Sequence, residues 1–309
     1  MSARWVAGSV RSRLLARRRL GREGARAIAG ASSPAEAIGL LARTPYGHDV
    51  DATMSPSDAR HAITRTALWH LRILAGWLTP QGADTVRTLA GWFEIANIEA
   101  HLAGLSGSSD ERRFELGALG VAWSRVRMAT SAREVRAILV SSSWGDPGGE
   151  SGPEMAVGLR LSWARRIYEG VPVAAEWAAG YAALTLATEL VAFRRTLTGP
   201  ATSQAVRVLG GGWKEASWSE PVEVATRLPG TARWVLDGID NWTQLWLAEG
   251  AWRRRVEDDA LRLVVRSGTG ADIVAAAAAL MLVDAWLACA ALEAVAWGDV
   301  GREVLDASV

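Results

Sequence analysis

The sequence predicts an all-α protein, and three observations support this class. Apolar residues recur at helical spacing through most of the 309 residues, and half of all residues are hydrophobic. Alternation typical of a strand is scarce, because the best candidate, residues 171–175, is too short to count. Helix start signals and Gly/Pro breaks divide the chain into helical segments. We therefore expect a body built from helices alone.

The first element expected is a helix rich in arginine. Eight arginines and one acid, Glu23, lie within residues 1–26, although the whole chain has a net charge of only +1. This segment lacks the apolar stretch of a signal peptide. Nucleic-acid binding would also require interleaved aromatic residues. An acidic protein partner, an anionic membrane surface and a solvated face remain open alternatives.

A short helix is expected next, beginning at Ser33-Pro34-Ala35-Glu36 and ending at Thr44-Pro45-Tyr46-Gly47. Its first four residues predict a capping box, in which the Ser33 hydroxyl accepts from the third amide and Glu36 reaches back to the Ser33 amide. Ser55-Pro56-Ser57-Asp58 starts a long helix, and Thr79-Pro80 separates it from a second one. These two helices would form an αα-hairpin over residues 60–107.

The second helix of this hairpin carries Asn97 on its apolar stripe, one turn after Glu94. A buried amide left without a partner costs about 1–3 kcal/mol, so we expect Asn97 to bond across to a neighbouring helix or a loop carbonyl.

The short helix and its following break recur along the chain. Ser131-Ala132-Arg133-Glu134 repeats the cap 98 residues later and leads to Ser143-Trp144-Gly145, and Glu223 begins a third copy 89 residues further on. Long helical segments separate the copies. This pattern predicts three related helical bundles with pseudo-threefold symmetry, over residues 1–107, 108–199 and 200–309.

An apolar segment near the end of the chain, residues 273–297, could be read as a core helix or as a membrane span. Only eleven apolar residues precede Asp284, which is short of the roughly 20 that a bilayer requires. We therefore expect a buried helix. Most of the 16 tryptophans lie in helical segments, where core packing, partner contact and a ligand cage are the three alternatives.

No residues assemble a catalytic, metal or cofactor site in the sequence. The four histidines have no metal-ligand spacing, and the single cysteine, Cys289, permits no disulfide within the chain. Glu257-Asp258-Asp259 resembles half of the Mg²⁺ box of all-helical terpene cyclases, but a solvated charged face explains it as well. Gly210-Gly211-Gly212 lacks the frame of a phosphate-binding loop. We predict no enzyme activity, no metal, no cofactor and no small-molecule substrate.

Several motifs follow one another in an order known from one protein family. They are residues 7–15, Ser33-Pro34-x-Glu36, Thr44-Pro45-Tyr46-Gly47 and Glu94-x-x-Asn97-Ile98. Together they resemble the family of C subunits of the V-type and A-type rotary ATPases, which are known as d subunits in the vacuolar enzyme. The second repeat departs from the family pattern, because alanine stands at 187 and Glu189 is a shifted substitute.

The resemblance implies a funnel-shaped, non-catalytic component of the central stalk. Members of this family sit on the cytoplasmic side of the membrane, hold the rotor shaft in a socket and couple it to the membrane rotor ring for ion transport. We expect partner contacts at Arg17, Arg18, Arg19 and Arg22. Positions of the repeat architecture follow from the same comparison: Tyr46, Glu94, Asn97, Glu134, Glu189 and Glu223.

Two other hypotheses belong to different classes. One is an all-helical enzyme of the terpene-cyclase type, which would need two acidic clusters converging on an apolar cavity. The other is a free-standing helical scaffold that binds proteins.

Overall fold

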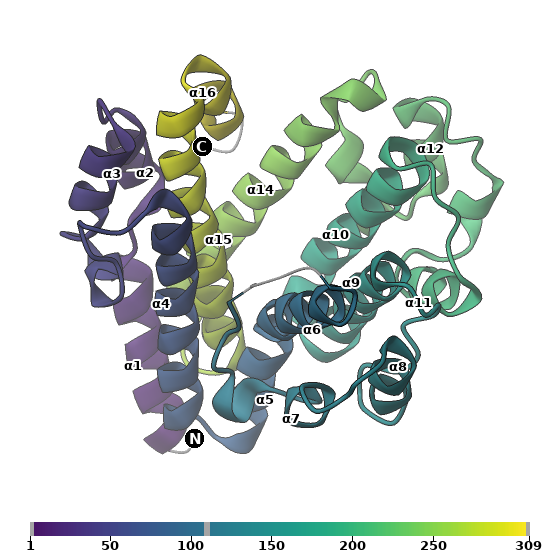
Figure 1. The fold of residues 1–309 in the computed structure, drawn as a ribbon, viewed down its shortest axis with the longest axis horizontal. Helices are drawn as coiled ribbons and strands as arrows, with labels where there is room; N and C mark the ends of the chain where they lie inside the picture. The colour runs from purple at the N-terminus through teal and green to yellow at the C-terminus, as the bar shows by residue number, and fades with distance from the viewer. Residues whose placement is uncertain (1–2, 108–111, 307–309) are drawn as a thin grey trace. The chain divides into compact units, whose positions relative to one another are not determined.

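The structure is a computed structural model that describes residues 3–107 and 112–306 (Figure 1). The chain packs as two compact units. Unit 1 comprises Met1–Val86 with Arg253–Val309, and unit 2 comprises Arg87–Trp252. This division groups residues by packing, and the three repeats, with boundaries at residues 107 and 199, stay a prediction.

Unit 1 is organised around the helix α15, Ala271–Trp297, which contacts four other helices and is followed by α16, Asp299–Asp306 (Figure 1). These four are α1 (Ala3–Arg18), α2 (Gly21–Ala29), α3 (Pro34–Leu41) and α4 (Pro56–Trp77). The unit also contains the 3₁₀ turn η1 (Pro45–His48) and parts of α5 (Pro80–Leu89) and α14 (Leu245–Arg266). A central helix with neighbours on several sides must be apolar around its whole circumference.

The composition of α15 meets that requirement. Five consecutive alanines, residues 275–279, are all buried, and their small side chains let neighbouring helices approach closely. By length and composition α15 could also cross a membrane, since its most apolar window has a mean hydropathy of 2.2. However, 78% of that window is buried. This burial is typical of a core helix and agrees with the expectation from the sequence.

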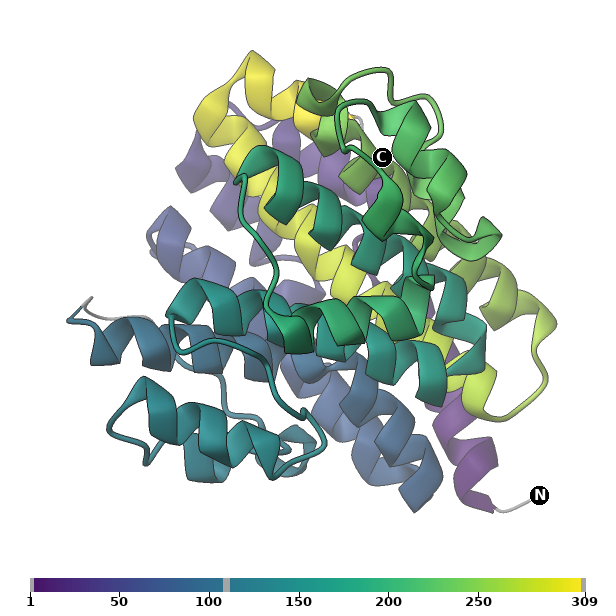
Figure 2. The ribbon, with the colours of Figure 1, turned by 90° about the vertical axis from the view of Figure 1, so that its right-hand side faces the viewer.

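Unit 2 is organised around α9, Gly152–Gly170. This helix contacts α6 (Gly91–Leu105), α10 (Ala175–Ala187) and α11 (Gly199–Leu209). In Figure 2, α6 is blue and the other helices of this group are teal to green. Shorter elements follow α6 and α11: η2 (Gly117–Leu119), α7 (Trp123–Val126), α8 (Ala132–Val140), η5 (Gly212–Glu215), α12 (Pro221–Arg227), α13 (Gly230–Arg233), η6 (Trp234–Leu236) and η7 (Trp242–Gln244). Two more flank α10: η3 (Pro172–Ala174) and the π-helix η4 (Thr188–Ala192).

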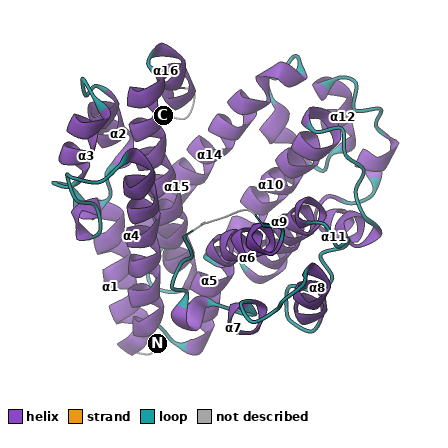
Figure 3. Ribbon diagram, viewed as in Figure 1, coloured by secondary structure: helices purple, strands orange, loops and turns teal. Residues whose placement is uncertain are grey.

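All regular elements within the described ranges are helices, so the all-α class is confirmed (Figure 3). The long helix begins as predicted, because the Ser55 hydroxyl accepts from the Asp58 amide at 3.2 Å. The second helix of the predicted hairpin is interrupted at Ala90, whose ψ of −1° turns the chain between α5 and α6. The segment considered as a strand candidate, residues 171–175, instead contains the 3₁₀ turn η3. Pro172 holds its own φ at a helical value there.

The caps of the repeated short helices differ in one respect from the predicted capping box. The hydroxyls of Ser33 and Ser131 accept from Glu36 and Glu134 amides as expected, at 3.2 and 3.3 Å. However, the two carboxylates accept from the amides of the residues before each serine, both at 2.7 Å. The cap residues have φ of −155° and −146° here, against −83° at Ser151, where a complete box forms. The φ angle of the cap serine, which is the rotation about its N–Cα bond, therefore decides which amide the glutamate reaches.

The aromatic-glycine break after each of these helices requires its glycine for a different reason. A Cβ on Gly47 would lie 2.1 Å from the Ala42 carbonyl oxygen, so only glycine fits. Gly145 instead has a φ of +74°, which strains other residues.

Candidate functional site

Asp284 is a buried acid of unit 1 and lies in the middle of α15. Its side chain is 3% exposed and accepts three hydrogen bonds. The donors are the Leu20 amide at 3.0 Å, the Gly21 amide at 2.7 Å and the Tyr46 hydroxyl at 2.7 Å. A carboxylate on one helix thus ties together the starts of α2 and η1.

Asp284 acts as a helix cap supplied from a distant part of the chain. The helix α2 begins at Gly21, and the preceding Leu20 offers no side-chain cap. The first amides of a helix lack partners within the helix and carry a partial positive charge, so a carboxylate at this end is stabilising. The carboxylate of Asp284 fills this place.

Burial raises the pKa values of both Asp284 and Tyr46. Desolvation raises the pKa of Asp284 above its ordinary value, and the bonds from Gly21, Tyr46 and Leu20 oppose that rise. Burial also raises the pKa of Tyr46 well above its usual value, and the nearby charge of Asp284 adds to the effect. Tyr46 therefore stays a hydrogen-bond donor to Asp284 over the whole physiological range.

Glu94 on α6 plays the same part in unit 2. It is 1% exposed, and it accepts from the amides of Val121, Ala122 and Trp123 at 2.6–3.0 Å. These amides open α7, whose N-cap residue, Ala122, has no side-chain cap of its own. One turn later Asn97 exchanges two hydrogen bonds with the backbone of Phe114, at 2.7 and 2.8 Å. The expected bond from Asn97 to a loop carbonyl is confirmed.

Glu189, in the π-helix η4, is a further buried acid and is 2% exposed. It forms an ion pair with Arg195 at 3.3 Å and caps no distant helix among the described residues. The three acids Glu94, Glu189 and Asp284 are each separated by 95 residues. The sequence analysis selected the first two and missed Asp284, although this spacing would have found it.

The other repeat positions lie near the surface. Glu134 belongs to the cap of α8, where its carboxylate binds the Thr130 amide and hydroxyl. Glu223 accepts from the Ser217 amide at 3.1 Å and from the Ser217 hydroxyl, and these bonds lower its pKa. Neither residue contacts the buried acid of its repeat, so each serves its own short helix.

The four arginines expected at a partner surface fall into two groups. Arg17 and Arg18 are exposed. Arg19 and Arg22 instead pair with the buried Glu257, at 3.2 and 2.6 Å, and Arg22 also pairs with Asp258 at 2.7 Å.

The acidic segment 257–259 is therefore occupied by arginines, because Asp259 pairs with Arg255 and Arg262 as well. Glu257 is 2% exposed, so it is not part of a solvated face. Within residues 3–107 and 112–306, no group of three or more His, Cys, Asp or Glu side chains could hold a metal ion.

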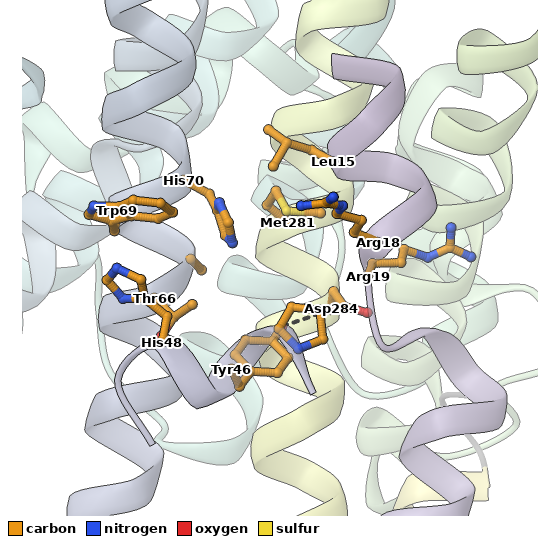
Figure 4. A pocket seen from close by; sticks show the side chains of 12 residues that line it. Leu15, Arg18, Arg19, Tyr46, His48, Thr66, Trp69, His70, Met281 and Asp284 are labelled. Carbon is orange, nitrogen blue, oxygen red and sulfur yellow. Dashed lines mark hydrogen bonds between the residues drawn. The ribbon is translucent and has the colours of Figure 1, made fainter. Parts of the chain in front are cut away.

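A cavity of about 430 Å³ lies in unit 1 between α1, η1, α4 and α15 (Figure 4). Tyr46 and Asp284 form one end of it, and Arg18, His48 and His70 line its sides. Trp69, Leu15 and Met281 supply apolar walls. This combination of cationic and apolar groups was not apparent in the sequence, since the residues come from four separate elements.

Comparison with models of known protein families and with curated proteins found no match to this chain.

Proposed function

We propose that this chain is a non-catalytic coupling subunit of a V/A-type rotary ATPase. In this proposal three related helical bundles form a pseudo-threefold, funnel-like socket that receives the rotor shaft. The socket rests on the membrane rotor ring at the cytoplasmic face of the membrane and couples the two during ion transport.

The observation that carries the proposal is the spacing of three of the four buried acids. Glu94, Glu189 and Asp284 recur at 95-residue intervals and are 1%, 2% and 3% exposed. Buried carboxylates are rare because desolvation is costly. Four are buried among the described residues, Glu257 being the fourth, and the recurrence of the other three at a fixed interval supports a repeated unit. Triplication of a helical unit is what the resemblance to the rotary ATPase family implies.

The contacts of two of these acids, Glu94 and Asp284, also support a repeated unit. Glu94 and Asp284 each cap a helix that precedes a serine-capped short helix, α7 before α8 and α2 before α3. The aromatic-glycine break follows in both cases, at Tyr46 and at Trp144. Two stretches with the same order of elements, each beginning with a helix whose amides a buried carboxylate caps, support descent from one repeated unit.

A mechanical role suits this construction. Close-packed helices resist compression and transmit strain, which a coupling subunit must do under torque. Bonds between segments far apart in the sequence, such as that from the Gly21 amide to the Asp284 carboxylate, hold the packed helices in register. The exposed Arg17 and Arg18 offer positive charge to an acidic shaft or to lipid head groups.

The test is purification of the intact complex. An affinity tag on this chain in its own cells, followed by mild detergent extraction of membranes, should recover ATP-hydrolysing and rotor-ring subunits in fixed stoichiometry. Arg17→Glu should reduce this recovery, whereas Arg133→Glu, an exposed arginine on α8, serves as the matched control. Recovery of this chain without these subunits would reject the proposal.

A second candidate, the free-standing protein-binding scaffold, is favoured by exposed tryptophans. Trp77 and Trp297 in unit 1 are 52% and 74% exposed, and large exposed aromatic side chains often mark binding surfaces. The same purification separates the two candidates, because a scaffold would bring down a defined partner unrelated to rotary ATPases.

A further inference from the structure

The cavity of unit 1 gathers more positive charge than its carboxylates balance. The Arg18 guanidinium points into the space between α1 and α4 in Figure 4 and has no hydrogen bond or ion pair to any described residue. The Nδ1 atom of His70 and the Nε atom of the neighbouring Arg11 are buried without a hydrogen-bond partner in the described chain. Buried polar atoms are normally satisfied, so each orphaned atom requires an explanation.

The two carboxylates nearest to the cavity are already engaged. Asp49 binds Arg65 at 2.8 Å, the Thr66 hydroxyl at 3.0 Å and His48 at 3.2 Å. Asp284 is held by two backbone amides and Tyr46. Neither acid is therefore free to pair with Arg18 or His70, and the cationic groups repel one another.

The titration of His70 agrees with this imbalance. Burial lowers the pKa of His70 to about 4, and the charges of His48, Arg11 and Arg18 contribute to the shift. An anion within the cavity would reverse these electrostatic contributions and favour a protonated His70.

The walls of the cavity suit a ligand with an apolar body. The His48 ring stacks on Trp69 with ring centroids 4.1 Å apart, and Leu15 and Met281 lie on the other side. The volume, about 430 Å³, falls within the range of small-molecule sites. Aromatic and aliphatic walls beside cationic groups are complementary to an organic anion.

We propose that this cavity is a binding site for an organic phosphomonoester, whose phosphate contacts Arg18 and His70 and whose apolar part lies against Trp69. Arginine binds phosphate through parallel N–H bonds, and a dianion compensates several cations at once. The same headgroup occurs on soluble phosphomonoesters and on phosphatidic acid in a membrane. The inference does not rest on the rotary ATPase proposal, although Arg18 belongs to both, because the cavity and its lining are observed without any partner.

The experiment uses phenyl phosphate as the probe and histidine NMR as the readout. The chain has four histidines, so few imidazole signals overlap, and His70→Gln identifies the signal of His70. We expect millimolar phenyl phosphate to raise the pH at which His70 titrates from about 4 towards neutrality. No change in the His70 titration would overturn the proposal.

Two arginine variants separate a built site from general attraction to a basic helix. Arg18→Gln should weaken phenyl phosphate binding about tenfold or more, because it removes a charged hydrogen bond. Arg17 and Arg18 are both exposed, but only Arg18 lines the cavity. Arg17→Gln therefore removes the same charge from a neighbouring position that does not line it and should leave binding within about twofold. Equal losses in the two variants would overturn the proposal.

Circular dichroism establishes that the variants are folded. If Arg18→Gln does not fold, Arg18→Lys takes its place, because lysine keeps the charge but cannot form the parallel N–H bonds of arginine. An affinity for phenyl phosphate that is unchanged in both Arg18→Lys and Arg17→Gln would overturn the proposal.

Vesicles of phosphatidylcholine, with and without phosphatidic acid, distinguish the two sources of ligand. Binding to phosphatidic acid that phenyl phosphate displaces would support the site and identify a lipid headgroup. Binding of phenyl phosphate without capture by these vesicles would support the site and identify a soluble ligand.

Discussion

Two regions of the molecule solve the same problem with different groups. The Asp284 region of unit 1 and the Glu94 region of unit 2 each use a buried acid to cap a helix that has no local side-chain cap. Asp284 accepts from two backbone amides and the Tyr46 hydroxyl, whereas Glu94 accepts from three backbone amides. The aromatic residue at the break completes the cap only in the first region.

The second region compensates its buried charge in another way. Trp144 replaces the tyrosine, and its indole nitrogen has no hydrogen-bond partner in the described chain. Arg166 lies over this ring, 4.5 Å from its centroid, and the charge of Glu94 acts on it favourably. The comparison shows that what must be kept is a satisfied buried carboxylate, while the third group that satisfies it can change.

The largest expected effect is the loss of charge at Glu94. Glu94→Gln places an amide donor against three backbone donors and removes the charge facing Arg166, so we expect unfolding to become easier by about 3–5 kcal/mol. Urea unfolding measures this loss. Glu99→Gln, on the same helix and paired with Arg160 near the surface, is the control and should cost less than about 1 kcal/mol. Similar costs would show that the Glu94 cap is unimportant.

Tyr46→Phe tests the group that is particular to the Asp284 region. Removal of the hydroxyl leaves Asp284 with two donors, and we expect a loss of about 1–3 kcal/mol in urea unfolding near neutral pH. Tyr168→Phe, a partly buried tyrosine of unit 2, is the control and should stay within about 0.5 kcal/mol of the parent.

The pH dependence of Tyr46→Phe has a definite sign. Since burial raises the pKa of Asp284, the folded chain holds more protons than the unfolded chain between the ordinary carboxyl pKa and the raised value. Its stability contribution therefore falls as pH rises through that window. The Tyr46 bond favours the charged carboxylate, so the penalty of Tyr46→Phe should grow with pH there. A penalty independent of pH would contradict the assigned role.

His70 gives the Asp284 region a pH response, because its Nδ1 atom is buried without a hydrogen-bond partner in the described chain. The histidine of the Glu94 region, His101, instead has its Nε2 atom 3.0 Å from the Ala129 carbonyl oxygen. The pKa of His70 is lowered to about 4, so the unfolded chain binds more protons between about pH 6.5 and pH 4. Stability should therefore fall by about 1–2 kcal/mol as pH decreases through this window, less than full linkage because the side chain is partly solvated. Urea unfolding of the parent and His70→Gln, compared across this window, isolates the effect.

Hydrogen exchange locates the response. Protection factors of amides in α4 should decrease relative to those in α6 as pH falls, and His70→Gln should remove the difference. A uniform decrease in both helices would show that His70 is not its source.

Local chemistry explains which features the sequence could predict. The helix at Ser55 and the bond made by Asn97 depend on cap residues and on the cost of a buried amide, both of which are visible in a short stretch. Asp284 could not be found this way, because its partners Leu20 and Gly21 lie 264 and 263 residues away. Only the 95-residue interval from Glu189 could have indicated it, and that interval was not used.

The cavity was unpredictable for the same reason. Arg18 and His70 lie on separate helices, and each alone resembles an ordinary surface cation or core histidine. Their shared space exists only after α1, α4 and α15 pack, so the predicted absence of a small ligand had no structural information behind it.

The smallest expected effect concerns the feature that the two regions share most closely. Ser33 and Ser131 cap α3 and α8 with bonds of 3.2 and 3.3 Å, and both have extended backbones. Ser33→Ala and Ser131→Ala should therefore each cost about 1 kcal/mol, and the two costs should agree within about 0.5 kcal/mol.

The control for Ser33→Ala and Ser131→Ala is a substitution that keeps the N-cap hydrogen bond. Ser33→Asp keeps an oxygen acceptor at the N-cap and should be nearly neutral. The third short helix supplies the reverse test, because its N-cap residue Glu220 forms no side-chain cap. Glu220→Ser should stabilise the chain by about 0.5–1 kcal/mol if the third copy can adopt the cap of the first two. A loss of stability in Glu220→Ser would mean that this copy has diverged in its backbone as well as in its side chains, which would weaken the case for three equivalent units.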